Sequence, residues 1–494
     1  MKKIAFDNAR YVELQSSHIK QRIEEFGDKL YLEFGGKLFD DYHASRVLPG
    51  FEPDSKIKML CNLAEEVEIV IVISAEDIEK NKIRKDYGIT YDSDVLRLID
   101  AYRSIGLYVG SVCITKYAGQ PTANKFRHKL ENQGISTFLH YPIEGYPNNI
   151  TNIVSNDGFG KNDYIETSKP LVVITAPGPG SGKMATCLSQ LYHEHRRGVK
   201  AGYAKFETFP IWNLPLKHPV NLAYEAATAD LDDVNMIDPF HLDAYGKTTV
   251  NYNRDVEIFP VLKATFEKIM GVCPYKSPTD MGVNMAGYCI CDDEAAALAS
   301  KAEILRRYYH TLVDYKLTRV SENAVTKIKN IMAQAEITID ERHCVVAANQ
   351  ASETSNAPAF AIELNDGKLI TGKTKTLLGC SSACLLNALK YLANIPDETH
   401  LISPKVIEPI QTLKIETLGN ANPRLHTDEV LIALAISATF DMNASKALDC
   451  LYELKDCEAH CSVILSQVDE RTYHKLGVNL TCEPEFETEN LFQK

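Results

Sequence analysis

A glycine-rich loop that ends in a lysine is the part of the sequence with the clearest chemical potential. The apolar stretch 171–175 runs into Ala-Pro-Gly-Pro-Gly-Ser-Gly-Lys at positions 176–183, and a helical pattern follows at once. Glycines let backbone N–H groups converge on phosphate oxygens, while a helix N-terminus and a lysine side chain add positive charge. We therefore expect a phosphate or nucleotide site with these cofactor-binding residues: Gly178, Gly180, Ser181, Gly182, Lys183 and Thr186.

The loop departs from the standard phosphate-loop pattern, G-x-x-x-x-G-K-[ST], at two positions. Pro177 replaces the first glycine and has no N–H to donate, and Met184 replaces the hydroxyl residue that binds Mg²⁺. Thr186 or Ser181 could supply the missing hydroxyl, although Thr186 could equally donate to the backbone four residues earlier. The alternative interpretation is a structural strand–loop–helix turn that binds no phosphate.

Charged side chains gather in the segment that follows the next predicted strand, residues 207–260. Loops of this composition beside a phosphate site are where metal ligands and substrate-positioning groups are found. We predict that Lys183, Arg254 and Asp255 are catalytic, with Arg254 balancing charge in the transition state. Two alternatives are that the acidic residues are turn and cap residues, and that Arg254 pairs with Asp255. The predicted ligands of a divalent cation are Asp232, Asp233, Asp238 and His241.

A second candidate site lies in the last third of the chain. Gly379-Cys-Ser-Ser opens a predicted apolar helix that runs to residue 393, so an anion could bind there and the helix N-terminus would lower the pKa of the Cys380 thiol. Either Cys380 or Ser381 is then a nucleophile, or Ser381 or Ser382 simply caps the helix. No C-x₂-C pairs occur at zinc-finger spacing, so we expect the cysteines to be core thiols.

Alternating helices and strands must position these residues. Strand patterns occupy 30–34, 67–74, 107–114, 135–139, 171–175 and 200–206, and helical patterns occupy 11–26, 54–66, 92–105, 120–133 and the stretch up to 197. Short β-branched strands that alternate with helices indicate a parallel sheet covered on both faces, and such sheets bind ligands at the carboxyl ends of their strands. The glycine-rich loop lies at one such end. However, at least three strands precede it, whereas this loop follows the first strand in most P-loop enzymes.

The rest of the chain has a different pattern. Helical spacing continues from 294 to 335 with a break near Ser321, and the apolar stretch 430–438 predicts a buried helix. Strand patterns occupy 344–348 and 359–364, and the second forms a hairpin with 368–371 through an Asn-Asp-Gly turn. We predict an α/β fold with a P-loop-like parallel-sheet domain over 1–230, irregular loops and a helical segment over 231–335, and a C-terminal α/β/α domain over 336–494.

Composition limits the classes of partner. The chain has 494 residues and a formal net charge of −13, which argues against a nucleic-acid-binding surface because such surfaces are normally basic. No apolar stretch approaches the roughly 18 residues of a membrane span. The 13 cysteines are an odd number in apolar contexts, which favours a reducing compartment. We expect a cytoplasmic protein with a small phosphate-bearing ligand, no nucleic acid or membrane partner, and a homo-oligomer as one option.

Several longer strings point to one family. They are Thr175-Ala-Pro-Gly-Pro-Gly-Ser-Gly-Lys183, Phe206-Glu-Thr-Phe-Pro-Ile-Trp212, the segment 229–242, Asn253-Arg-Asp255, Thr371-Gly-Lys373 and Gly379. Together they resemble the bacterial family catalogued as DUF1846 or UPF0371 over nearly the whole chain. The resemblance implies a P-loop-like α/β region, a helical insertion, and a C-terminal α/β/α domain with a cytidine-deaminase-like shape but without the zinc motif. It implies no reaction, so function must be argued from the site.

Three functional interpretations follow from the sequence. The first is a nucleotide- or phosphate-binding protein that uses ATP or another nucleotide with Mg²⁺ for phosphoryl transfer or hydrolysis on a small molecule. The second is a non-hydrolytic binding or regulatory protein that holds an anionic ligand with the same loop, which the loss of the hydroxyl at Met184 favours. The third is catalysis without a nucleotide, built around Cys380 or Ser381.

Overall fold

The computed structural model describes residues 3–27, 29–36, 38–39, 41–84, 88–231 and 233–488, and the chain forms two compact units. The first unit consists of Ile4–Tyr224 and Asp233–Ala299. The second consists of Ser300–Lys494, the short segment Glu225–Asp232 and Met1–Lys3. The predicted domain boundaries stay a prediction. None of the helices in these described ranges is both long and apolar enough to cross a membrane.

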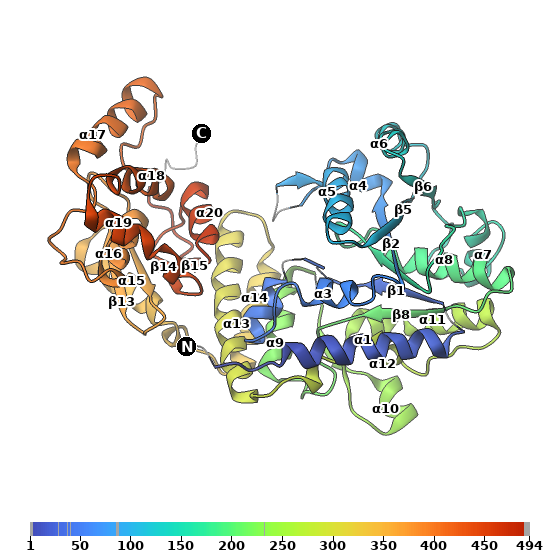
Figure 1. Ribbon diagram of the computed structural model, residues 1–494. Coiled ribbons are helices and arrows are strands. Elements are labelled where there is room, and N and C mark those ends of the chain that lie inside the picture. Colours follow the sequence, from blue (N-terminus) through green and yellow to red (C-terminus); the bar gives the residue numbers. More distant parts are fainter. Residues whose placement is uncertain are drawn as a thin grey trace. The chain divides into compact units, whose positions relative to one another are not determined.

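A seven-stranded parallel sheet forms the centre of the first unit (Figure 1). Its order is β11, β8, β1, β7, β2, β5, β6, and every neighbouring pair is parallel. The six predicted strands are confirmed to within two residues at each end, whereas the two-residue β11 has no strand signal in the sequence. The strands are Leu30–Phe34 (β1), Val67–Ser74 (β2), Tyr108–Thr115 (β5), Ser136–Leu139 (β6), Leu171–Thr175 (β7), Gly202–Phe206 (β8) and Gly282–Val283 (β11).

Helices cover both faces of this sheet, as its buried strands require. Tyr31 of β1 donates a hydrogen bond to Glu194 of α8 at 2.6 Å, so α8 lies on one face. On the opposite face, Phe206 of β8 stacks on Phe34 with ring centroids 4.1 Å apart, and Lys56 of α3 lies over Phe206. The long helices of the unit are Asn8–Glu25 (α1), Tyr91–Ser104 (α5), Pro121–Asn132 (α6), Lys183–Arg196 (α8) and Asn253–Met270 (α11), and Ser55–Cys61 (α3) is shorter.

Smaller elements complete the first unit. Two antiparallel hairpins pair β3 (Ile83–Arg84) with β4 (Ile89–Thr90) and β9 (Asn235–Ile237) with β10 (Val250–Tyr252). Helix α9 (Pro219–Ala227) and helix α13 (Asp293–Lys316) each contain residues of both units. The short helices are Tyr42–Val47 (α2), Ala75–Glu79 (α4), Ile150–Ile153 (α7), Pro239–Tyr245 (α10) and Pro278–Met281 (α12).

The second unit contains a four-stranded mixed sheet in the order β13, β12, β14, β15. Strands Ala359–Glu363 (β12) and Leu369–Lys373 (β13) form the predicted hairpin, and Glu458–Cys461 (β14) runs parallel to Asn479–Cys482 (β15). Side chains of β12 alternate between two helical layers: Ala361 packs against α15, whereas Phe360 and Ile362 join the core formed with α16. The helices are α14 (Glu322–Gln334), α15 (His343–Ser355), α16 (Cys380–Leu392), α17 (Pro404–Thr412), α18 (Thr427–Ser437), α19 (Met442–Asp449) and α20 (Gln467–Lys475).

Two sequence predictions for the second unit need correction. Residues 344–348 are not a strand but part of helix α15, because Cys344, Val345 and Ala348 bury one helical stripe and the residues that follow continue the helix. A short apolar run does not by itself distinguish a strand from a helix. Helix α18 is present, yet it is not buried on all sides, since Ile432 is 61% exposed.

Candidate functional site

The glycine-rich loop lies at the carboxyl end of β7, and helix α8 begins at its last residue, Lys183. Strand β1 lies between β7 and β8, so the segments that follow these three strands meet at one edge of the sheet. Ligands of parallel sheets bind at this edge. The predicted loop, the residues after β8 and the first residues of α8 are therefore placed where a site is expected.

Three glycines of the loop occupy positions where a side chain is disfavoured: Gly180 and Gly182 by positive φ, and Gly178 by the closeness of Tyr91. Gly182 is the N-cap of α8 and has a φ of 91°, which side-chain-bearing residues rarely adopt. A Cβ atom on Gly178 would lie 2.3 Å from the hydroxyl oxygen of Tyr91. Side chains also hold the loop in place: Thr115, at the end of β5, donates a hydrogen bond to the Ser181 carbonyl at 2.6 Å. The loop is thus a fixed structure and not a loose connection.

Several hydrogen-bond donors of this loop have no acceptor among the described residues. The Lys183 side chain forms no hydrogen bond or ion pair with the residues that the structure describes, and it is only partly buried. Unpaired donors at a helix N-terminus bind water or an anion. Within the same described ranges, no protein acceptor receives the backbone N–H groups of Gly178, Gly180, Ser181, Gly182, Lys183 and Met184.

The two candidate hydroxyls are occupied. Thr186 is fully buried, and its Oγ1 donates to the Gly182 carbonyl at 3.0 Å, which is the backbone bond that the sequence left as the alternative. Ser181 is also buried, and its Oγ donates to the Gly178 carbonyl at 2.7 Å. Both side chains therefore stabilise the loop.

The predicted clamp residues have separate partners and do not pair with each other. Arg254 forms an ion pair with Asp233: Nη2 donates a hydrogen bond to Oδ2 at 2.8 Å, and Nε lies 2.6 Å from Oδ1. Asp255, at the start of α11, forms a buried ion pair with Lys205 of β8. The structure thus places two of the predicted catalytic residues in separate ion pairs and leaves Lys183 without a partner among the described residues.

The predicted metal ligands are not brought together. Asp238 caps α10 by accepting the N–H groups of Phe240 and His241, both at 3.0 Å, and its second oxygen accepts a bond from Thr279 at 2.6 Å. His241 Nδ1 lies 3.0 Å from the Ser277 hydroxyl. Asp232 lies outside the described residues. In the part of the chain that is described, no group of three or more His, Cys, Asp or Glu side chains is arranged to hold a metal ion.

A buried polar cluster at the end of β8 contains residues that the sequence analysis did not select. The Lys205 ammonium contacts the Asp255 carboxylate and the Tyr252 hydroxyl, and it lies 3.1 Å from Glu207 Oε1. The Tyr252 hydroxyl in turn donates to Glu207 Oε1 at 3.3 Å. Two carboxyl groups and one ammonium therefore share a site with almost no exposure to solvent. We call Lys205, Glu207, Tyr252 and Asp255 the β8 cluster.

Electrostatics in the β8 cluster favour proton exchange near neutral pH. Burial raises the pKa of Glu207 to about 7; the Lys205 ammonium opposes this rise and the Asp255 carboxylate adds to it. Burial alone would lower the pKa of Lys205, but the Asp255 carboxylate and its other anionic neighbours hold that pKa well above its usual value. Glu207 is thus poised to exchange a proton while Lys205 stays charged.

Glu33 lies beside the β8 cluster on the neighbouring strand. It is paired in register with Lys205 in the neighbouring strand, so both side chains point to the sheet face that α8 covers. Tyr203 donates a hydrogen bond to Glu33 Oε2 at 2.7 Å. Burial and the nearby Glu33 raise the pKa of Cys187 in the second turn of α8, whereas Lys183 opposes that rise, so all three groups are electrostatic neighbours.

Comparisons with known proteins assign the family. A family model described as the N-terminal domain of unknown function DUF1846 matches residues 4–336, and its C-terminal counterpart matches residues 340–492. The UPF0371 protein of Streptococcus pyogenes serotype M5 (strain Manfredo) is 58% identical over 494 residues, which cover 100% of both chains. A UPF0371 protein of Streptococcus pneumoniae (strain JJA) has the same identity and coverage.

The chain belongs to the DUF1846 family. Two of the strings that resemble this family meet at the sheet edge: one forms the glycine-rich loop, and the other contains Glu207. Lys205 comes directly before the second string. A lysine in a buried strand is almost always paired, so Lys205, two residues before Glu207, was the signal that could have revealed the β8 cluster.

The C-terminal candidate residues of this DUF1846 chain lie at the start of α16. The N-cap of α16 is Gly379, and neither Ser381 nor Ser382 caps the helix. Ser382 instead donates to the Leu425 carbonyl at 3.0 Å. Cys380 is the first residue of α16 and is almost fully buried, with its Sγ 3.7 Å from Cys461 Sγ.

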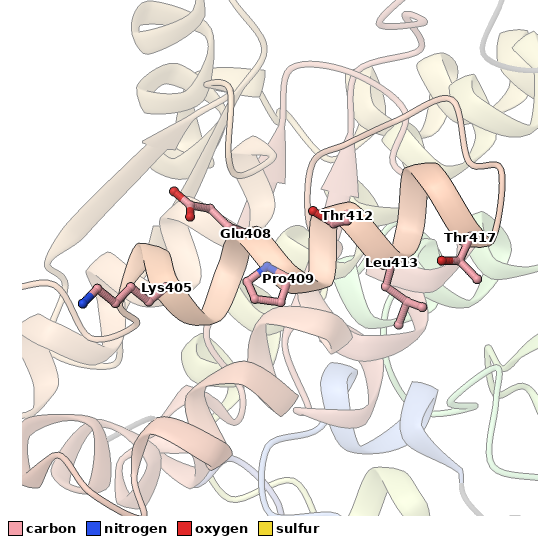
Figure 2. A pocket seen from close by; sticks show the side chains of 6 residues that line it. All are labelled: Lys405, Glu408, Pro409, Thr412, Leu413 and Thr417. Carbon is pink, nitrogen blue, oxygen red and sulfur yellow. The ribbon is translucent and has the colours of Figure 1, made fainter.

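A surface hollow of the second unit contains none of these candidate residues. Figure 2 shows that its six lining side chains come from one continuous helical stretch, α17 and the π-helical turn Leu413–Thr417 that follows it. With a single lysine and a single glutamate, the hollow lacks the convergent polar groups of a ligand site. The lining residues are Lys405, Glu408, Pro409, Thr412, Leu413 and Thr417.

Proposed function

We propose that this protein binds a phosphate-bearing small molecule at the carboxyl edge of its seven-stranded sheet, with residues 178–183 as a P-loop-like cradle. One observation carries the proposal: the N–H groups of this loop and the Lys183 ammonium have no acceptor among the described residues, although they belong to a rigid loop at a helix N-terminus. Such an arrangement favours an anion. A nucleotide is the first ligand to test.

The proposal does not depend on a metal ion held by the protein. The hydroxyls of Ser181 and Thr186 already donate to loop carbonyls, and Asp233 and Asp238 already bind other groups. Any cation that accompanies a nucleotide would therefore be held mainly by the phosphates themselves. Binding should consequently persist without Mg²⁺.

A catalytic version of this function is supported by the β8 cluster. Since β1 separates β7 from β8, their carboxyl ends lie two strand spacings apart, about 10 Å. A ligand whose phosphate occupies the loop would then extend toward Glu207 and Lys205, and the side chains that bury this pair would have to move aside to admit it. Glu207 would act as a general acid or base there, and Lys205 would hold negative charge. We place this protein accordingly among candidate enzymes that act on small phosphorylated molecules.

Calorimetric titration of the full chain with orthophosphate, ATP, ADP and GTP, each with and without Mg²⁺, tests the proposal. Binding of at least one of these ligands, retained in the presence of a chelator, is the expected result. If none binds at millimolar concentration, the loop is a structural turn and the proposal fails. If binding requires Mg²⁺, the claim that the cradle is sufficient is wrong.

A further inference from the structure

Two cysteines of the second unit lie close enough to react with each other. Cys380 is the first residue of α16, Cys461 is the last residue of β14, and their sulfur atoms are 3.7 Å apart. A disulfide bond is about 2.05 Å long, so closure requires a sulfur displacement of roughly 1.7 Å. This site lies outside the sheet edge and is independent of the function proposed above.

The surroundings of the pair distinguish the two sulfurs. Hydrogen bonds from the Cys461 thiol, the Thr374 side chain and the Ser381 backbone lower the pKa of Cys380, although burial opposes this effect. Burial and the neighbouring Cys380 raise the pKa of Cys461 well above its usual value. One sulfur is thus favoured as the thiolate and the other as the thiol, which is the asymmetry that stepwise oxidation requires.

We propose that Cys380 and Cys461 form a peroxide-reactive dithiol that closes to a disulfide. The Cys380 thiolate attacks one oxygen of hydrogen peroxide, the O–O bond breaks, and the other oxygen leaves as hydroxide, so Cys380 becomes a sulfenic acid. The Cys461 sulfur then displaces the sulfenic oxygen, which takes the Cys461 proton and leaves as water. The first hydroxide takes up the proton that Cys380 had released. Overall, two thiols are oxidised to one disulfide and one peroxide is reduced to two waters.

Burial selects the oxidant. Cys380 is 4% exposed and Cys461 is fully buried, so a small hydroperoxide can reach the pair more readily than a bulky disulfide reagent. Cys384 offers a matched control because it lies one turn later on the same helix. It is also buried, its Sγ contacts the Ile370 carbonyl at 3.3 Å, and burial raises its pKa well above the usual value.

The test is disulfide mapping of the full chain after treatment with hydrogen peroxide. Remaining thiols are alkylated, the protein is digested, and linked peptides are identified by mass spectrometry. We expect a Cys380–Cys461 linkage that dithiothreitol reverses and that forms equally in Cys384→Ser. In Cys461→Ser, we expect the linkage to be absent and dimedone to label a sulfenic acid at Cys380.

Three results would overturn the proposal. They are a folded wild-type protein that keeps both thiols, a linkage between Cys461 and its strand neighbour Cys482 in place of Cys380, and oxidation confined to the exposed Cys61 or Cys291. If the serine variants do not fold, wild-type protein decides the matter alone. The Cys380–Cys461 linkage must then form faster in the native chain than in the chain unfolded in urea, and an equal or slower rate refutes the proposal.

Discussion

Replacing Glu207 with glutamine should change how the stability of the first unit depends on pH. Burial raises the pKa of Glu207 from its usual value of 4.5 to about 7, so between these pH values the folded state holds a proton that the unfolded state has lost. Below pH 4.5 Glu207 is protonated in both the folded and the unfolded chain, so it has no effect on the pH dependence of stability there. Between pH 4.5 and 7 the unfolded chain loses this proton and the folded chain keeps it, so the stability of the fold falls as the pH rises. A pKa change of this size corresponds to about 3 kcal/mol of folding free energy above pH 7.

The variant removes this ionisation while it keeps the shape of the side chain and an oxygen that accepts hydrogen bonds. The free energy of unfolding of Glu207→Gln, compared with wild type, should therefore rise by about 3 kcal/mol between pH 4.5 and pH 8 and then level off. Urea titrations followed by the fluorescence of Trp212 measure this directly. Trp212 is the only tryptophan, and a Cβ on Gly282 would meet both Trp212 and Glu207, so the probe lies beside the mutated group.

Glu13 provides the matched control because it is exposed on α1 of the same unit. The difference in unfolding free energy between Glu13→Gln and wild type should stay constant over the same pH range. If the difference in unfolding free energy between Glu207→Gln and wild type is also independent of pH, the reasoning is refuted. Glu207 would then ionise alike in the folded and unfolded chains.

Two further variants test the β8 cluster and the loop. Lys205→Met leaves two buried carboxyl groups without their cation, so we expect the free energy of unfolding at pH 7, measured in urea, to fall by about 3–5 kcal/mol. The exposed control Lys129→Met should lose about 0.5 kcal/mol or less. A loss below about 1 kcal/mol in Lys205→Met would contradict the buried ion pair. Gly182→Ala and Gly198→Ala both place a side chain at positive φ, 91° and 74°, and each should lose about 1–2 kcal/mol. Only Gly182→Ala should weaken phosphate binding in calorimetry, and equal affinity of the two variants would show that the loop does not hold the ligand.

The α/β pattern of the first unit could be predicted because its signals are local. Strand β2 is rich in β-branched residues and is buried along its whole length. The glycine-rich loop after β7 marks the start of a helix. The run 344–348 was ambiguous because five apolar residues fit either a strand or one turn of a buried helix. In the structure this run belongs to α15, which buries Cys344 and Ala348 against Ala361 of β12.

The site was less predictable because its contacts are distant in sequence. Lys205 and Asp255 are fifty residues apart, and their ion pair exists only because α11 begins next to the end of β8. Asp233 resembled a metal ligand because it lies in an acidic segment, yet it forms an ion pair with Arg254 across an intervening helix and hairpin. Spacing along the chain does not contain this information, whereas the loop glycines could be selected because their role depends on the backbone alone.

Binding of phosphate ligands to wild type and to Lys183→Ala tests the central claim most directly. The Lys183 ammonium is the one side chain of the cradle without a partner among the described residues, and a charge-assisted bond of about 1.5–3 kcal/mol corresponds to roughly 10- to 150-fold in affinity. Calorimetry with orthophosphate and ATP should show this loss in Lys183→Ala but not in Lys129→Ala, with both variants folded as wild type. Equal affinity of wild type and Lys183→Ala would contradict the account, because the ligand would then bind elsewhere.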